Sequence, residues 1–94
     1  MSEITTVHVV VEGRVQGVGY RGWCADAAVE RRLSGWVRNL KSGAVEAIFS
    51  GPSDTVSDML EHLWRGPAFA RVRAVKPTPS DKVLTGEFEI RESA

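Results

Sequence analysis

The segment over residues 13–21 (GRVQGVGYR) holds the residue types and spacing best suited to chemistry. Glycines at positions 13, 17 and 19 allow a tight turn and keep side chains away from the backbone N–H groups. Where such a loop leads from a strand into a helix, several N–H groups lack a helical partner and the helix dipole favours an anion. The Arg21 guanidinium could fork onto two phosphate oxygens. The segment indicates a site for a phosphate-sized dianion, although such a turn can also be only a solvated helix start.

A second candidate for chemistry is Asn39, in the segment 35–40 (GWVRNL). Asn39 has the strand parity of Val37, so its side chain is expected on the helix-covered face, near the loop. An asparagine carries both a donor and an acceptor and can hold a water molecule in place. The alternative is that Asn39 only bonds its own backbone before the turn at residues 41–43.

The elements that must position these residues follow from hydrophobic periodicity and turn residues. Val7, Val9 and Val11 alternate on one face of the first strand, which predicts a buried valine face. Strands are expected over residues 6–12, 36–40, 44–50 and 71–75, and helices over residues 21–33 and from a cap at Ser53 or Asp54 to a stop at Gly66-Pro67.

The segments after the fourth strand are less regular. Pro77 and Pro79 are expected to lead out of that strand, into a polar, mobile loop over residues 80–86. Residues 86–91 alternate with Phe88 and Ile90 facing inward, and residues 92–94 are expected to fray.

This order of elements predicts the α+β class: a ferredoxin-like βαββαβ sandwich, with two helices on one face of an antiparallel four-stranded sheet. The length of 94 residues predicts one domain over residues 1–94.

The charge and cysteine content limit the function further. Lys plus Arg and Asp plus Glu each number 12, so the net charge is zero, which argues against a nucleic-acid binder. Cys24 is the sole cysteine, so no internal disulfide can form and a cytoplasmic location is expected. We expect neither a secretory signal nor a membrane-spanning stretch.

The two motifs GRVQGVGYR and GWVRNL, at this separation and in this strand order, resemble the acylphosphatase family. The resemblance covers nearly the whole chain and includes the strand around residues 45–47, the Gly51-Pro52 turn and residues 88–90. It implies an enzyme that hydrolyses the carboxyl–phosphate anhydride of acyl phosphates to a carboxylate and inorganic phosphate, without metal or cofactor. It also implies that Arg21 binds the phosphate and that Asn39 positions the water. The implied phosphate-binding loop consists of Val15, Gln16, Gly17, Val18, Gly19 and Tyr20.

The chemistry implied by the resemblance needs little more than positioning. Acyl phosphates have a good leaving group, so charge neutralisation by the loop and Arg21, with a water placed by Asn39 for in-line attack, can suffice. No carboxylate or histidine is placed as a base, and the resemblance suggests that a substrate phosphate oxygen takes the proton. The expected partner is a small acyl phosphate, with inorganic phosphate as product and competitive inhibitor; no nucleic acid or membrane is expected, and the chain is expected to be a monomer.

The sequence departs from the family pattern at three places. Tyr20 stands where the family usually has phenylalanine, and Ser42 where it usually has aspartate before the turn glycine. Arg31-Arg32 replaces a common Leu-Gly, which puts the geometry of the first helix end in doubt.

Three other functions compete with this interpretation. Residues 17–22 match the dinucleotide-binding pattern G-x-G-x-x-G, but that pattern needs a parallel βαβ unit and an acidic residue after the second strand. An RNA-binding module would need the aromatic RNP pattern, which is missing. The chain could also be an acylphosphatase-like domain cut from a hydrogenase-maturation carbamoyltransferase, acting on carbamoyl phosphate.

The remaining reactive residue types favour structural roles. His8 and His62 are not paired with a nucleophile and are expected to be surface or half-buried, while Cys24 is expected to be a buried apolar residue. No cluster has metal-ligand spacing. The three tryptophans are expected to pack or lie on the sheet, and a basic group is expected to be a solvated strand face: Arg71, Arg73 and Lys76.

Overall fold

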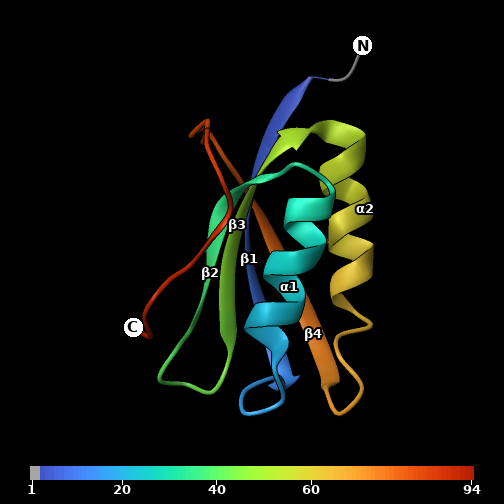
Figure 1. The fold of residues 1–94 in the computed structure, drawn as a ribbon, viewed down its shortest axis with the longest axis vertical. Helices are drawn as coiled ribbons and strands as arrows, with labels where there is room; N and C mark the ends of the chain where they lie inside the picture. Colours follow the sequence, from blue (N-terminus) through green and yellow to red (C-terminus); the bar gives the residue numbers. More distant parts are fainter. Residues whose placement is uncertain (1–2) are drawn as a thin grey trace.

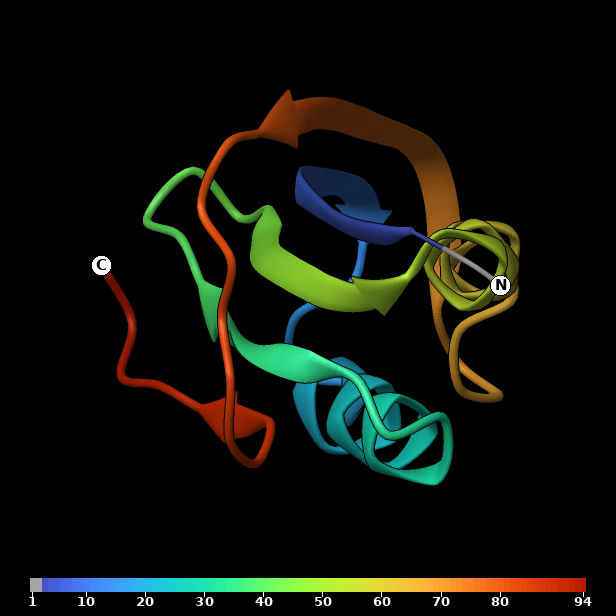
Figure 2. The same ribbon diagram turned by 90° about the horizontal axis from the view of Figure 1, so that it is seen from above.

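Two helices cover one face of a curved sheet in the computed structural model, which describes residues 3–94 (Figures 1 and 2). The strands lie in the order β4-β1-β3-β2-β5. The elements along the chain are β1 (Ile4–Arg14), α1 (Tyr20–Glu30), β2 (Ser34–Asn39), β3 (Val45–Pro52), α2 (Ser53–Leu63), β4 (Arg71–Ser80) and β5 (Glu89–Ile90). The α+β ferredoxin-like fold with both helices on one face is therefore confirmed.

The sheet has five strands rather than the expected four. The additional strand β5 pairs in parallel with β2, with Val37 opposite Ile90, whereas all other pairings are antiparallel. Of the two side chains expected to face inward, Phe88 is buried and stacks on Phe49 at 5.4 Å, but Ile90 is 52% exposed. The expectation for Ile90 was wrong because β5 is a two-residue edge strand, and alternation alone does not show how far a face is covered.

The antiparallel neighbours of β1 exclude the dinucleotide-binding alternative. β1 lies between β3 and β4 and pairs antiparallel with both, and β3 separates β1 from β2. β1, α1 and β2 therefore do not form the unit of two adjacent parallel strands that the dinucleotide-binding pattern needs.

β4 continues through the two prolines that were expected to end it. Pro77 lies opposite Val9 and Pro79 opposite Val7 in the register with β1. Proline is compatible with a strand at the edge of a sheet, because its missing N–H can face away from the neighbour. The expected end at Val75 was therefore five residues too early.

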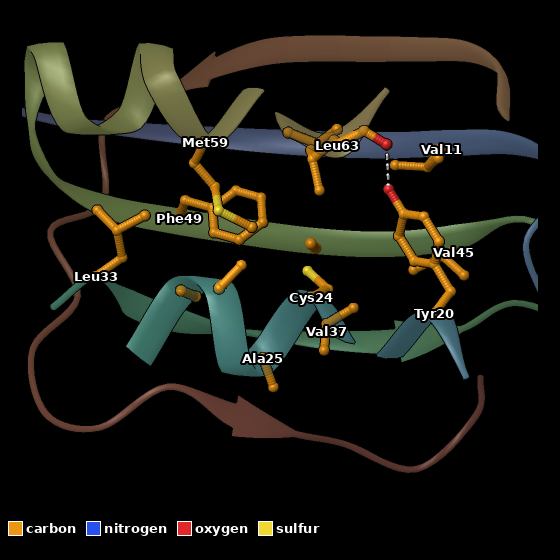
Figure 3. Packing of buried hydrophobic residues seen from close by; sticks show 14 of the residues in the cluster. Val11, Tyr20, Cys24, Ala25, Leu33, Val37, Val45, Phe49, Met59 and Leu63 are labelled. Carbon is orange, nitrogen blue, oxygen red and sulfur yellow. Dashed lines mark hydrogen bonds between the residues drawn. The ribbon is translucent and has the colours of Figure 1, made fainter. Parts of the chain in front are cut away.

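The buried core is built from the valine face of β1 and from small residues of α1. Cys24, Ala27 and Ala28 of α1 are buried, and their small size lets the helix approach the sheet closely. α2 adds Met59 and Leu63, which pack beside the sheet residues (Figure 3). Each fully buried large aliphatic side chain contributes about 1.5–3 kcal/mol to folding. This core fixes α1, and with it the loop before α1, against β2 and β3.

α1 ends at Glu30, three residues earlier than expected, in a left-handed turn. The Arg32 N–H donates to the Val29 carbonyl and the Leu33 N–H donates to the Ala28 carbonyl, which is the bonding pattern of a Schellman motif. Arg32 occupies the left-handed position with φ 57°, where glycine is usual. The substitution noted in the sequence therefore keeps the helix-end geometry and places a side chain in a strained conformation.

The start of α2 and the chain after β5 also differ from expectation. Pro52 occupies the cap position, no side chain caps α2, and the Ser53 N–H donates instead to the Glu3 carbonyl at 2.8 Å. Residues 92–94 do not fray, since the Ala94 N–H donates to the Asn39 carbonyl at 3.0 Å. Neither helix of residues 3–94 is long and apolar enough to cross a bilayer.

Candidate active site

The loop between β1 and α1 covers residues 15–19 and lies at the same end of the molecule as the β2–β3 hairpin (Figure 1). Gly17 has φ 73° and Gly19 has φ 80°, a region that side chains disfavour. A Cβ at either position would meet nothing within 4 Å. These glycines are therefore required by the backbone conformation and not by lack of space.

Seven consecutive amides lead from this loop into α1 without a backbone acceptor. No N–H from Gln16 to Gly22 donates to a carbonyl within residues 3–94, and the first that does is Trp23, which donates to Gly19 at 3.1 Å. α1 has 11 residues, so its dipole adds positive potential at this end. Free amides and a helix N-terminus together make this loop suited to an anion.

Arg21 and Asn39 line the same hollow, which has a volume of about 250 Å³. Its walls are formed by Val15, Gln16, Gly17, Gly19, Tyr20, Arg21, Gly22, Asn39 and Ile90. Of the loop residues singled out in the sequence, Val18 is absent from the walls because its side chain packs against the core. The motifs that are separated in sequence thus share one cavity.

Two wall residues were missed by sequence reasoning. Gly22 could have been found, because the first turn of any helix has unpaired N–H groups. Ile90 gave no signal, because its place depends on the parallel pairing of β5 with β2.

The Arg21 side chain is half-buried and has no hydrogen-bond or ion-pair partner among residues 3–94. It extends from the first turn of α1, beside the free amides. Two other half-buried arginines are occupied: Arg31 pairs with Asp58 at 2.8 Å and Arg38 with Glu46 at 2.6 Å. Arg21 is thus a cation available to a ligand in the hollow.

The Asn39 backbone is held on two sides while one side-chain atom has no partner. Asn39 lies opposite Val45 in the β2–β3 ladder, and its carbonyl accepts the N–H of Ala94. Its Oδ1 atom is buried and accepts no hydrogen bond within residues 3–94. A buried polar atom without a protein partner is uncommon and points to a ligand or water as partner. The turn-capping alternative for Asn39 is not observed, since this oxygen does not bond the backbone.

Tyr20 contributes to the walls from a buried position. Its hydroxyl donates to the Leu63 carbonyl at 2.7 Å and so joins the start of α1 to the end of α2 (Figure 3). Burial, and secondarily the neighbouring Cys24, raises the pKa of the Tyr20 phenol far above its ordinary value. The phenol therefore stays neutral and does not act as a base.

The other reactive side chains lie outside the hollow. His8 is half-buried and bonds Glu46 at 2.7 Å, and His62 stacks on Trp23 with ring centroids 4.6 Å apart. Burial raises the pKa of the Cys24 thiol to about 12, so the thiol is a core residue and not a nucleophile. Within the described part of the chain, no three His, Cys, Asp or Glu side chains are grouped to hold a metal.

Comparison with known proteins agrees with the motifs. The sequence model of the acylphosphatase family matches residues 7–90. An acylphosphatase of Azorhizobium caulinodans is 59% identical over 71 residues, which are 76% of each protein. Acylphosphatase 2 of Ralstonia nicotianae is 48% identical over 92 residues and covers 97% of each. The solved acylphosphatase of Coxiella burnetii superposes with a TM-score of 0.90 at 38% identity, over 94% of this chain and 93% of that one.

A match over almost the full described sequence, together with relatives near half identity and a shared fold, leaves one assignment: this chain belongs to the acylphosphatase family.

Proposed function

We propose that this acylphosphatase hydrolyses its acyl phosphate by in-line attack of a water that Asn39 positions on a phosphoryl group held by the 15–21 loop and Arg21. The observation that carries the proposal is the shared hollow, whose walls include Asn39, Arg21 and the loop with its unpaired amides; Arg21 and the Oδ1 atom of Asn39 have no partner among residues 3–94.

The phosphoryl group would be held by charge and by directed N–H groups. The amides of residues 16–22 are free to donate, and the N-terminus of α1 adds positive potential. Arg21 would add two parallel hydrogen bonds to phosphate oxygens. Since charge spreads over the equatorial oxygens in the transition state, donors fixed in advance would stabilise that state more than the bound substrate.

The nucleophile would be a water held by the Asn39 carboxamide, which lines the hollow. The water oxygen attacks phosphorus, and the bond between phosphorus and the oxygen that bridges it to the acyl group breaks. The carboxylate leaves with the electron pair of that bond. The water proton passes to an oxygen of the phosphoryl group, because the walls carry no carboxylate or histidine and the Tyr20 hydroxyl is bonded to Leu63. The products are a carboxylate and inorganic phosphate.

Several further properties belong to the same proposal. Arg21 and the loop amides supply the positive potential, so we expect the reaction to need no metal ion. Inorganic phosphate fits the same donors and should compete with substrate. We expect a monomeric, single-domain enzyme over residues 1–94, since the loop, Arg21 and Asn39 of one chain already line one hollow. The lone thiol of Cys24 supports a cytoplasmic location.

Hydrolysis of benzoyl phosphate, with EDTA present and inorganic phosphate as competitor, tests the proposal. Arg21→Ala should raise KM and lower kcat, and Asn39→Ala should lower mainly kcat, each change in kcat being about 100-fold or more. Arg14→Ala removes an exposed arginine that precedes the loop but does not line the hollow, and it should behave as wild type. Retention of more than about a tenth of kcat in either site variant would overturn the assigned roles.

A further inference from the structure

The Gln16 side chain joins the phosphate-binding loop to the strand that carries Asn39. Its Nε2 atom donates to the Leu40 carbonyl at 2.8 Å and to the Ala44 carbonyl at 2.7 Å. These carbonyls lie on the two sides of the β2–β3 hairpin, and Leu40 directly follows Asn39. Both N–H groups of one carboxamide are therefore used to connect the loop with the hairpin.

The connection joins the loop and the hairpin beside the hollow, where no main-chain hydrogen bond joins them within residues 3–94. Residues 15–19 donate no main-chain hydrogen bond to residues 39–45 and accept none from them within the described chain. The hairpin has its own closing bonds, from Leu40 to Ala44 at 2.9 Å and from Gly43 to Leu40 at 3.1 Å, so its turn does not depend on Gln16. Gln16 therefore adds a direct side-chain link between the hairpin and the loop to the core packing and the β1–β3 pairing that already hold both.

We propose that Gln16 is a positioning residue, whose side chain fixes the distance and angle between the free amides of the loop and the carboxamide of Asn39. In-line attack requires the water and the phosphoryl group to be aligned, and a displacement of about 1 Å can cost about 100-fold in rate. Both N–H groups of the Gln16 carboxamide are occupied by carbonyls, so they are not available to donate to the phosphoryl group. The inference rests on the function proposed above.

Gln16→Met tests the inference, because methionine keeps much of the length of the side chain and removes both donors. We expect kcat for benzoyl phosphate to fall on the order of 10- to 100-fold while the inhibition constant for inorganic phosphate changes little, since the loop amides and Arg21 remain. Ser42→Ala is the matched control: it removes the only side-chain bond within the hairpin turn, from the Ala44 N–H to Ser42 Oγ at 3.3 Å, and should leave kcat unchanged. If the inhibition constant for phosphate rises by the same factor by which kcat falls, Gln16 only maintains the structure of the loop. If kcat is unchanged, the two hydrogen bonds of Gln16 have no role in catalysis.

A double-mutant cycle separates positioning from general damage. If Gln16 acts through Asn39, then Gln16→Met should reduce kcat far less in an Asn39→Ala background than in wild type. Equal reductions in both backgrounds would overturn the inference. A normal kcat in Asn39→Ala alone would instead overturn the proposed function, so the two failures are distinguishable.

Gln16→Glu provides a second variant if the methionine form does not fold. A carboxylate facing the carbonyls of Leu40 and Ala44 repels both, whereas the protonated carboxyl can donate one hydrogen bond. The ratio of its kcat to that of wild type should therefore rise as the pH falls through the pKa of the new carboxyl. A flat ratio across that range would contradict the role of these two hydrogen bonds.

Discussion

Ala94 and Asn39 are joined through the main chain: the N–H of Ala94 donates to the Asn39 carbonyl at 3.0 Å, and the Ala94 carbonyl accepts from Lys41 at 3.0 Å. With the bond from Arg91 to Val37 at 2.9 Å, these contacts continue the parallel pairing of β5 alongside β2 beyond the two residues of the strand itself. The backbone that presents the Asn39 carboxamide is therefore held by β3 on one side and by residues 91–94 on the other.

The first prediction concerns this bond. Ala94→Pro removes the N–H that Asn39 accepts, so Asn39 should become less well ordered and kcat should fall a few-fold, well short of the roughly 100-fold that complete misplacement can cost. Steady-state kinetics with benzoyl phosphate measures the effect. Ser93→Ala, at an exposed neighbouring residue, is the control and should match wild type. A proline variant with wild-type kcat would show that β3 alone fixes Asn39.

Removal of the Tyr20 hydroxyl should reduce stability without removing activity. In Tyr20→Phe, the Leu63 carbonyl at the end of α2 loses its donor, and the free energy of unfolding should fall by about 0.5–1.5 kcal/mol. Urea unfolding measures the change. Because the hydroxyl is not used in the proposed reaction, kcat should stay near the wild-type value; a large loss of kcat would assign the phenol a part in the chemistry.

Replacement of Arg32, the left-handed residue at the end of α1, by glycine should stabilise the protein. Arg32 adopts φ 57°, and Arg32→Gly should raise the free energy of unfolding by about 0.5–1 kcal/mol, because relief of the strain exceeds the entropy that glycine adds to the unfolded chain. Arg32→Ala keeps the strain while removing the charged side chain, so it should not stabilise the protein. Equal stability of the two variants would show that the backbone conformation at this position carries no penalty.

Stability in acid should depend on Glu46. Burial by itself would raise the pKa of Glu46, but hydrogen bonds from His8 and Arg38 outweigh burial and hold the pKa below its ordinary value. A carboxyl whose pKa is lowered by folding stabilises the protein fully above its unfolded pKa, about 4.3, and loses that stabilisation as the pH falls through the folded pKa. The stability difference between wild type and Glu46→Gln should therefore shrink in acid, as the pH falls through the folded pKa of Glu46. A difference that grew as the pH fell would contradict this assignment.

Most of the fold could be predicted because local signals and packing agree. The alternating valines of β1, the Lys41-Ser42-Gly43 turn and the spacing of Val56, Met59 and Leu63 each specify the element that the structure contains. The elements that were misjudged depend on long-range pairing. The prolines are compatible with β4 only because that strand is at an edge of the sheet. The contacts of residues 91–94 can be predicted only if the strand that lies beside them is known.

The candidate site could be predicted from sequence for a similar reason, but only in part. Unpaired amides at the start of a helix follow from its geometry, so the loop and Arg21 could be singled out from their types and order. The orientation of the Gln16 side chain could not be predicted, because a carboxamide in a glycine-rich loop can face a ligand or the protein equally well. The two carbonyls that it contacts are also 24 and 28 residues away in the sequence. Ile90 was missed because an edge strand of two residues leaves too short a pattern to read.

The prolines of β4 have a further consequence for how the protein behaves at high concentration. β4 forms the outer margin of the sheet, and an open margin can recruit the same strand from another molecule and begin aggregation. Pro77 and Pro79 occupy alternate positions there, so the strand cannot present an unbroken row of donors to an incoming chain. The residues that seemed to mark the end of a strand thereby protect the exposed side of the sheet against intermolecular pairing.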